Sequence, residues 1–387
     1  MSSLRQGRRV FGLILSLALA ALTGAGAMLG NCGPFTDVAA DVFCPFVLEI
    51  FYLGITTGTT ATTYDPAGNV TRLQMAAFLS RSVDGVLRRG GRRAVLDRFW
   101  TPSNTLVVGL TSLGTTPGLV RFDGADLWVP VTSASAVARV RASDGRVLET
   151  WTGAGSGYGV VAAMGRILVS GASSPGALYR IDPGAPAGAV TTVASNLGAS
   201  ARGLTFDGGR FWTANAFGGV SIIAPAPIIP WTVNTVTTGF NGPVGALFDG
   251  ADVWVTDFNA GKLLKLGVTG AISLTVTVGS GAEHAVFDGA NIWVPNANDA
   301  SVTVVRASNG AILATLTGNG LFTPHVAAFD GERTAVTNGS GASISLWKAA
   351  DLTSLGAFGV GPAPFGACSD GIFFWITLEA PGGLARF

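Results

Sequence analysis

The sequence predicts a mainly β protein, a seven-bladed β-propeller that follows a small α-helical N-terminal module. Three observations predict this fold class. A short motif ending in Gly returns seven times, at intervals of 39 to 43 residues. Each copy holds short apolar segments separated by turns, with no helical periodicity between them. The first 83 residues contain no copy, and part of that segment has apolar residues at helical spacing instead.

Composition narrows the possible functions. Of 387 residues, 55 are Gly, 12% are charged and 48% are hydrophobic, with a net charge of +1. The 24 Lys and Arg residues are too few for the dense basic surface of a nucleic-acid-binding protein. The apolar content excludes a disordered chain. A mean hydropathy of +0.46 suggests a membrane protein. After residue 27, however, no uninterrupted apolar run reaches 18 residues, so no transmembrane span is expected in the mature chain.

Residues 1–27 are predicted to form an export signal. Arg5, Arg8 and Arg9 precede the uncharged apolar segment Val10 to Ala27, which ends in Ala-Gly-Ala. A basic start, an apolar middle and small residues at the end are typical of a secretory signal peptide. An uncleaved membrane anchor is the alternative, and a cleaved, a twin-arginine and a lipoprotein-type signal all remain open. The protein is therefore expected to be extracellular, at the cell surface or in the cell envelope.

The chain has three cysteines, Cys32, Cys44 and Cys368. Export favours a Cys32–Cys44 disulfide, because such bonds persist in oxidising compartments. Three free thiols are the alternative. The spacing matches no metal site, and neither a metal nor a cofactor is expected.

Residues 32–83 are predicted to form a module of two helices joined by a turn-rich loop. Apolar residues recur at helical spacing after Pro45, and a second apolar face follows Gln74. Thr71 and Gln74 have the spacing of a capping box, in which each side chain bonds the other residue's backbone N–H.

The same segment resembles a single S-layer homology (SLH) module. The matching residues, in the family's order, are Phe35-Thr36-Asp37-Val38, Ile50, Leu53-Gly54-Ile55-Thr56, Gly58, Tyr64, Pro66, Val70-Thr71-Arg72, Met75-Ala76 and Phe78-Leu79. The resemblance implies non-covalent binding to cell-wall polysaccharide, often an acidic polymer.

Within this resemblance, the wall-binding candidates are Thr71, Arg72, Asp37 and Gly58. A forked guanidinium suits an acidic sugar group, which assigns that contact to Arg72. The chain departs from the family in carrying Gln74 where Glu is usual, and in having one module where three are common. The alternative is that Thr71 and Gln74 only cap a helix, and that Arg72 is a solvated residue of its first turn.

Residues 84–103 are predicted to be an Arg-rich linker. Residues 1–100 contain ten Arg and six acidic residues, whereas residues 101–387 contain 14 basic and 17 acidic residues. A solvated linker is favoured, with contact to an acidic polymer or lipid headgroups as the alternative.

Residues 104–387 are predicted to form the propeller. The seven motif glycines are Gly124, Gly165, Gly208, Gly250, Gly289, Gly331 and Gly371. Four residues later stands Trp in five copies, with Val169 and Ala335 in the other two. In the fourth copy, turn residues separate segments 246–248, 253–255, 263–266 and 274–278, and four antiparallel strands make a propeller blade.

The last copy ends at its third strand, Leu384 to Phe387. Thr105 to Val108 has no blade of its own, and we expect it to complete the last blade and close the ring. The repeat resembles NHL, YVTN and virginiamycin-B-lyase-like propellers. Such folds host many activities, so the resemblance predicts the fold and not the function.

Most positions that repeat from blade to blade have structural explanations. The Phe and Trp residues fill space between blades, the Asp of Asp-Gly belongs to a turn, and Asn215, Asn296 and Asn338 fall at second turns.

The candidate propeller site lies at the starts of the inner strands, which surround one mouth of the central channel. Arg202, Glu283, His284 and His325 precede inner strands in copies three, five and six. Two His and a Glu can bind metal or move protons. The lyases that the propeller resembles use a His in one blade and Glu-x-His in the next, an order this chain does not share. Ordinary polar loop residues are the alternative.

The sequence therefore predicts an exported cell-envelope protein whose SLH-like module binds wall polysaccharide. Its propeller is expected to be a scaffold for a protein, glycan or small ligand. One alternative is a propeller enzyme of the lyase or hydrolase type, acting near Glu283, His284 and His325. Another is a purely architectural surface component.

Overall fold

The computed structural model describes residues 34–38, 43–52, 55–79, 82 and 109–387. The chain divides into two compact units, residues 1–95 and 96–387, and each is described by itself. The predicted signal segment, Cys32 and the Arg-rich linker lie outside the described residues. No helix in the described part of the chain is long and apolar enough to cross a membrane.

The N-terminal module contains helix α2 (Cys44–Tyr52) and a second helix over residues 72–79, as predicted. Its small core consists of Phe35, Val38 and Val47. The Phe35 ring lies edge-on to Phe51 at 5.1 Å between centroids, and Tyr64 flanks it at 5.7 Å. Phe35 therefore joins α2 to the loop that precedes the second helix.

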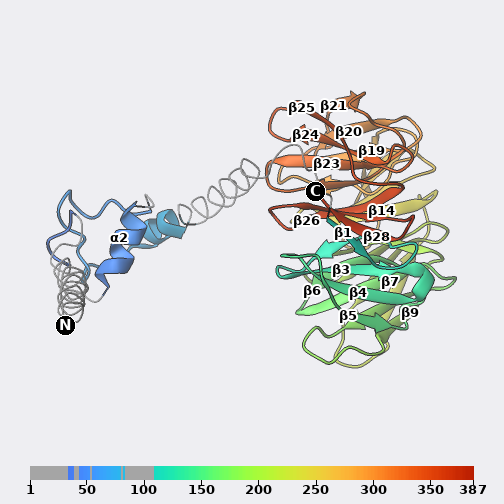
Figure 1. Cartoon of the computed structure of the whole chain (residues 1–387), viewed down its shortest axis with the longest axis horizontal. Coiled ribbons are helices and arrows are strands. Elements are labelled where there is room, and N and C mark those ends of the chain that lie inside the picture. The colour runs from blue at the N-terminus through green and yellow to red at the C-terminus, as the bar shows by residue number, and fades with distance from the viewer. Residues whose placement is uncertain (1–33, 39–42, 53–54, 80–81, 83–108) are drawn as a thin grey trace, which may run out of the picture. The chain divides into compact units, whose positions relative to one another are not determined.

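Residues 109–387 form seven four-stranded antiparallel sheets, which confirms the predicted seven-bladed propeller (Figure 1). The first strands of neighbouring sheets contact one another and are innermost. From inside to outside, the first four blades are blade 1, β2 (Arg121–Phe122), β3 (Asp126–Val131), β4 (Ala136–Arg141) and β5 (Val147–Thr152); blade 2, β6 (Gly157–Ala163), β7 (Arg166–Gly171), β8 (Gly176–Ile181) and β9 (Thr191–Leu197); blade 3, β10 (Ala201–Phe206), β11 (Phe211–Asn215), β12 (Gly219–Ala224) and β13 (Thr232–Val236); and blade 4, β14 (Pro243–Phe248), β15 (Val253–Asp257), β16 (Lys262–Leu266) and β17 (Ile272–Thr277).

The remaining blades follow the same order. They are blade 5, β18 (Val286–Phe287), β19 (Asn291–Asn296), β20 (Ser301–Arg306) and β21 (Ile312–Thr317); blade 6, β22 (Pro324–Phe329), β23 (Arg333–Asn338), β24 (Ser343–Lys348) and β25 (Ser354–Gly359); and blade 7, β26 (Pro364–Ser369), β27 (Phe374–Leu378), β28 (Gly383–Arg386) and β1 (Gly109–Ser112). A short 3₁₀ helix, η1 (Thr132–Ala134), follows β3.

The ring is closed by the two ends of the propeller sequence. Strand β1 pairs antiparallel with β28, so the first strand completes the last blade (Figure 1). The pairing was predicted, but the strand that makes it is Gly109–Ser112. The predicted segment Thr105 to Val108 lies outside the described residues. The pairing covers the edge of β28, so blade 7 has four strands like the other blades.

Hydroxyl groups tie neighbouring inner strands together. The Thr377 hydroxyl accepts a bond from Gly366 N at 2.7 Å and donates to Gly118 O of blade 1 at 2.9 Å. Thr337 makes the equivalent contacts with Val326 N and Phe365 O. These side chains satisfy backbone groups freed by bulges in the inner strands. The inner strands leave a cavity of only about 20 Å³ in the channel, room for about one water molecule.

The repeated Asp has a second role beyond its turn. Asp249 Oδ1 accepts the turn amides of Ala251 and Asp252, while Oδ2 accepts the indole N–H of Trp254 at 2.8 Å. The same Asp–Trp bond, at 2.7 Å, is found in blades 1, 3, 5 and 7. Each indole is thereby held against the following blade.

The three asparagines at second turns are more than turn residues. Asn215, Asn296 and Asn338 are fully buried. Asn296 donates to Ser301 and Thr303, and Asn338 donates to Ser343 and Ser345. Their amides therefore satisfy hydroxyl groups inside the blades.

Candidate functional site

The predicted mouth residues of blades 5 and 6 do come together. A parallel bridge joins the inner strands, in which His284 N donates to His325 O at 3.0 Å. Glu283 Oε1 lies 3.4 Å from His325 Nδ1, and Glu283 Oε2 lies 3.8 Å from His284 Nε2. Glu283 and His284 are buried, whereas the His325 side chain is 28% exposed. The carboxylate therefore lies between two imidazoles, only one of which reaches solvent.

His284 is held in its neutral form. Burial lowers the pKa of His284 to about 4, although the Glu283 carboxylate opposes that shift. The 3.8 Å contact with Glu283 is thus not an ion pair near neutral pH. Among the described residues, His284 Nε2 has no hydrogen-bond partner. A buried polar atom without a partner is uncommon and marks a position where a ligand or water can bind.

Aromatic residues from blades 2 and 7 complete this mouth. The Tyr158 ring lies 5.9 Å from His284 and 5.6 Å from Phe365, and Phe365 lies 5.5 Å from His325. The Arg202 guanidinium stands 5.4 Å over the Tyr158 ring. Burial raises the pKa of Tyr158 above its ordinary value, so its hydroxyl stays protonated.

The two aromatic residues were missed from the sequence. Tyr158 and Phe365 occupy the same inner-strand position as Arg202 and His325, inside the register shift of each strand. Glu283 holds that position in blade 5, next to the bridge between Ala282 and Asn296. Aligning the copies on that position would have found them. Within the described residues, no group of three or more His, Cys, Asp and Glu side chains is arranged to hold a metal ion.

The N-terminal module has a groove of its own, with a volume of about 540 Å³. It is lined by Thr56, Thr57, Gly58, Thr59, Tyr64, Asp65, Pro66, Gly68, Asn69, Val70, Gln74, Ala77 and Phe78. The lining combines hydroxyls, two side-chain amides, the two aromatic rings of Tyr64 and Phe78, and the Asp65 carboxylate. Such groups bind sugar hydroxyls and stack on sugar rings.

Asp37 supports this groove from behind. Its carboxylate accepts the backbone N–H groups of Tyr64 at 2.9 Å and of Asp65 at 2.7 Å. These bonds hold the pKa of Asp37 below its ordinary value. Asp37 therefore positions two groove residues, and its carboxylate is already engaged within the module.

Gly58 is needed for close packing. It has φ +77°, and a Cβ there would lie 2.4 Å from the Phe35 ring. Gly58 thus lets the wall of the groove approach the module's core.

The second helix begins with the predicted capping box. Thr71 N donates to Gln74 Oε1 at 2.8 Å, and Gln74 N donates to Thr71 Oγ1 at 3.2 Å. Gln74 lines the groove, and the exposed Arg72 lies between the two capping residues. The substitution of Glu by Gln at this position preserves the cap and removes a negative charge beside the groove.

Comparison with known families identifies this module. Residues 34–76 match the family model of the S-layer homology domain. The N-terminal module is an SLH domain. The match confirms the resemblance inferred from Thr71, Arg72 and the preceding motifs. No curated protein is significantly similar to the chain in sequence.

The propeller resembles solved structures in fold alone. A hydrazine synthase chain from Kuenenia stuttgartiensis has a TM-score of 0.62 and 14% identity, over 73% of this chain and 98% of that one. A catalytically inactive virginiamycin B lyase from Staphylococcus aureus with quinupristin has a TM-score of 0.59 and 15% identity, over 72% of this chain and 98% of that one. A streptogramin B lyase has a TM-score of 0.57 and 15% identity, over 72% of this chain and 95% of that one. Identities this low show the architecture and no activity.

Of the three cysteines, Cys44 and Cys368 lie in the described part of the chain. Cys44 is disulfide-bonded, and Cys368 is a free thiol buried in the propeller. Cys32 lies outside the described residues, so the Cys32–Cys44 bond stays a prediction. Burial raises the pKa of Cys368 to about 12, which keeps that thiol unreactive.

Proposed function

We propose that the protein is an exported cell-envelope protein whose SLH domain binds cell-wall polysaccharide and whose propeller is a ligand-binding scaffold. The observation that carries the proposal is the SLH domain over residues 34–76, together with its groove of hydroxyl and amide groups. SLH domains are typical of cell-surface proteins. A propeller offers a rigid set of loops on which a ligand can be held.

Arg72 is assigned the contact with an acidic sugar group. Its side chain is exposed at the start of the second helix, beside groove residue Gln74. A guanidinium forms two parallel hydrogen bonds with a carboxylate. The N-terminus of the helix adds favourable partial charge for an anion at the same end.

The test is co-sedimentation of the full chain with purified cell walls. We expect the wild type to pellet, and walls stripped of polysaccharide to leave it in solution. Arg72→Ala should reduce the pelleted fraction several-fold. Arg146→Ala, which removes an exposed Arg from the propeller, is the matched control and should pellet like the wild type. Equal pelleting of Arg72→Ala and wild type would refute the role of Arg72. A wild type that stays in solution with intact walls would refute wall binding.

A second function is favoured by one observation, the contact between Glu283 and His325 beside the unpartnered His284 Nε2. A neutral imidazole can accept a proton, and the carboxylate can orient the second ring. This arrangement supports a propeller enzyme of the lyase or hydrolase type. Quinupristin is a suitable first probe, since it occurs with a virginiamycin B lyase of similar fold.

Turnover of quinupristin should be followed by chromatography for the wild type and for the His284→Ala, His325→Ala double variant. Turnover that the double variant loses supports an enzyme at this mouth. Equal turnover by both proteins would place the chemistry elsewhere.

A further inference from the structure

One position in each blade packs against the following blade. It lies on the second strand of each sheet, opposite the equivalent position of the first strand. Its seven occupants are Trp128, Leu168, Trp212, Trp254, Trp293, Ala335 and Trp375. Counting from the motif glycine places Val169 in this series. The strand register corrects this to Leu168, because the first turn of blade 2 is shorter.

Where the occupant is Trp, the indole itself takes the position and is buried. Blade 4 does have a pocket of about 420 Å³ toward blade 5, but Asp249 and Asp252 line it and Trp254 does not. Each indole N–H is bonded to the turn Asp, and four of the five rings also have a cation over their face. Those cations are Arg139 over Trp128, Arg210 over Trp212, Lys265 over Trp254 and Arg386 over Trp375, at 5.0 to 5.8 Å from the ring centre. In these four blades the indole therefore contacts a carboxylate through its N–H and a cation through its face.

Blade 6 lacks the Trp but fills the space from within. Ala335 is small, and the Arg333 guanidinium enters instead. It bonds Asp330 Oδ2 at 2.7 Å and stands 5.1 Å over the Phe374 ring. The side chains of Arg333 and Asp330 are only 12% and 6% exposed. In blade 6 the Arg333 guanidinium therefore takes the place of the indole.

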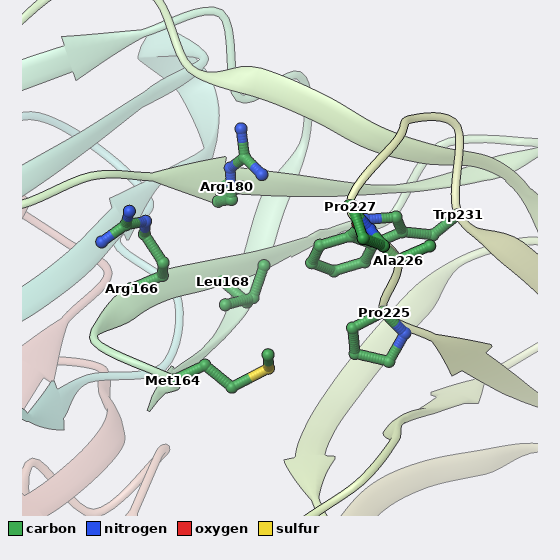
Figure 2. A pocket seen from close by; sticks show the side chains of 8 residues that line it. All are labelled: Met164, Arg166, Leu168, Arg180, Pro225, Ala226, Pro227 and Trp231. Atoms are coloured by element: carbon green, nitrogen blue, oxygen red, sulfur yellow. The ribbon is translucent and has the colours of Figure 1, made fainter.

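Blade 2 keeps the cation and loses the other two parts. Leu168 replaces the indole, and its cross-strand partner Arg180 corresponds to Arg139, Lys265 and Arg386. The turn is reduced to Met164 and Gly165, both at positive φ, so its Asp is gone. A pocket of about 380 Å³ opens beside Leu168, between blades 2 and 3 (Figure 2).

The opposite wall of this pocket is rigid. The blade 3 connection, residues 225–231, contributes two prolines, Pro225 and Pro227, together with Ala226 and Trp231. Trp231 stacks on Phe211 at 5.8 Å, and its indole N–H donates to Ala226 O at 2.8 Å. Figure 2 shows Trp231 and the prolines facing Leu168, Arg166 and Arg180. Because these contacts fix the wall, little ordering is needed when a ligand enters.

The positive charge of the pocket favours an anionic ligand. Arg166 and Arg180 line it, and none of its lining residues is acidic. Arg166 pairs with Asp182 at 3.2 Å, but both side chains are over 40% exposed, which leaves that pair weak. Among the described residues, Arg180 has no ion pair, unlike Arg139 and Lys265.

From these observations we propose that the pocket binds an aromatic ring that carries an anionic group. The ring takes the place of the missing indole against Leu168 and Trp231, and the anion pairs with Arg180. The ligand is either a free aromatic carboxylate or an aromatic residue beside an acidic one in a peptide. The proposal deepens the scaffold role of the propeller and rests on that role, but it does not depend on wall binding.

The test is calorimetric titration of the full chain, without cell walls, with two probes. Indole-3-acetate represents the free carboxylate, and an amidated N-acetyl-Trp-Asp peptide represents the peptide source. We expect one of them to bind, and the tighter probe identifies the source. Uncharged 3-methylindole should bind at least about tenfold more weakly than indole-3-acetate, since a charged hydrogen bond is lost.

Variants locate the site. Arg180→Gln should weaken binding at least about tenfold. Lys265→Gln, at the matching position of blade 4 where the indole is present, should bind like the wild type. Leu168→Trp restores the repeat residue and should abolish binding; Arg180→Gln keeps the test valid if that variant fails to fold. No binding of either probe, or equal binding by Arg180→Gln and wild type, would overturn the proposal.

Discussion

Blades 4 and 6 have the same tripeptide, Phe-Asp-Gly, where the first strand ends, at residues 248–250 and 329–331. Its Asp makes different contacts in the two blades. In blade 4, Asp249 accepts the indole N–H of Trp254. In blade 6, Asp330 forms a nearly buried ion pair with Arg333, which occupies the space of the absent indole. The repeat therefore specifies a gap between blades and a carboxylate beside it. How the gap is filled depends on residues outside the motif, and in blade 2, where Leu168 replaces the indole, the pocket reaches an apolar floor.

The largest effect is expected from emptying the gap of blade 4. Trp254→Ala removes a fully buried indole and should lower the free energy of unfolding by about 3–5 kcal/mol. Denaturant titration of the full chain measures this. Trp254→Leu, which recreates the residue of blade 2, should cost less. A loss for Trp254→Ala below about 1 kcal/mol would mean that the blades do not depend on their indoles.

The next effect separates the two aspartates. Asp330→Ala leaves the buried Arg333 without its partner and should cost about 3–5 kcal/mol of unfolding free energy. Asp249→Ala leaves only neutral donors unsatisfied and should cost about 1–3 kcal/mol. Both are measured by denaturant titration under the same conditions. If the two losses are equal, the aspartates have the same role in both blades and the comparison fails.

Blade 5, between these two, provides an acid-sensitive group. The pKa of buried His284 is about 4, below its unfolded value of 6.5. Between these values the unfolded chain binds a proton that the folded chain does not. The stability contribution of neutral His284 is therefore fully present above about pH 6.5 and is lost progressively toward pH 4. The loss should reach about 3 kcal/mol.

This dependence is measured as the free energy of unfolding between pH 7 and pH 4, for wild type and His284→Gln. The variant retains the other titrating groups and should show the shallower decline. Parallel curves would show that His284 is not kept neutral by the fold.

The sequence predicted the propeller because its signals are local and repeated. Turn residues and short apolar segments recur from copy to copy, so a strand misassigned in one copy can be corrected by comparison with the others. Ring closure was also predictable, since the last copy lacked a strand. The position of the closing strand was not predictable, because a four-residue apolar segment does not determine the register of its pairing. Counting from the motif glycine gave Val169 instead of Leu168, because the first turn of blade 2 is shorter than the others.

The sites were harder to predict. Glu283, His284 and His325 stood out as rare residue types, but Tyr158 and Phe365 resemble ordinary core residues until the inner strands are aligned. The pocket beside Leu168 has no motif at all. Its Leu168 stands where five other blades have Trp, its turn has no Asp, and its opposite wall is the proline-rich connection of the next blade. An absence of this kind becomes visible only against the other six blades.

The smallest effect is expected in the SLH domain, whose architecture depends on single local contacts instead of a repeated unit. Thr71→Ala breaks the capping box with Gln74 and should destabilise the domain by about 1 kcal/mol. Calorimetry of the full chain should show a lower unfolding temperature for this domain, while the propeller transition stays unchanged. Arg72→Ala is the control, because it removes no contact within the cap. If Thr71→Ala leaves the SLH transition in place, the cap does not hold the helix. If it also shifts the propeller transition, the two units do not unfold independently.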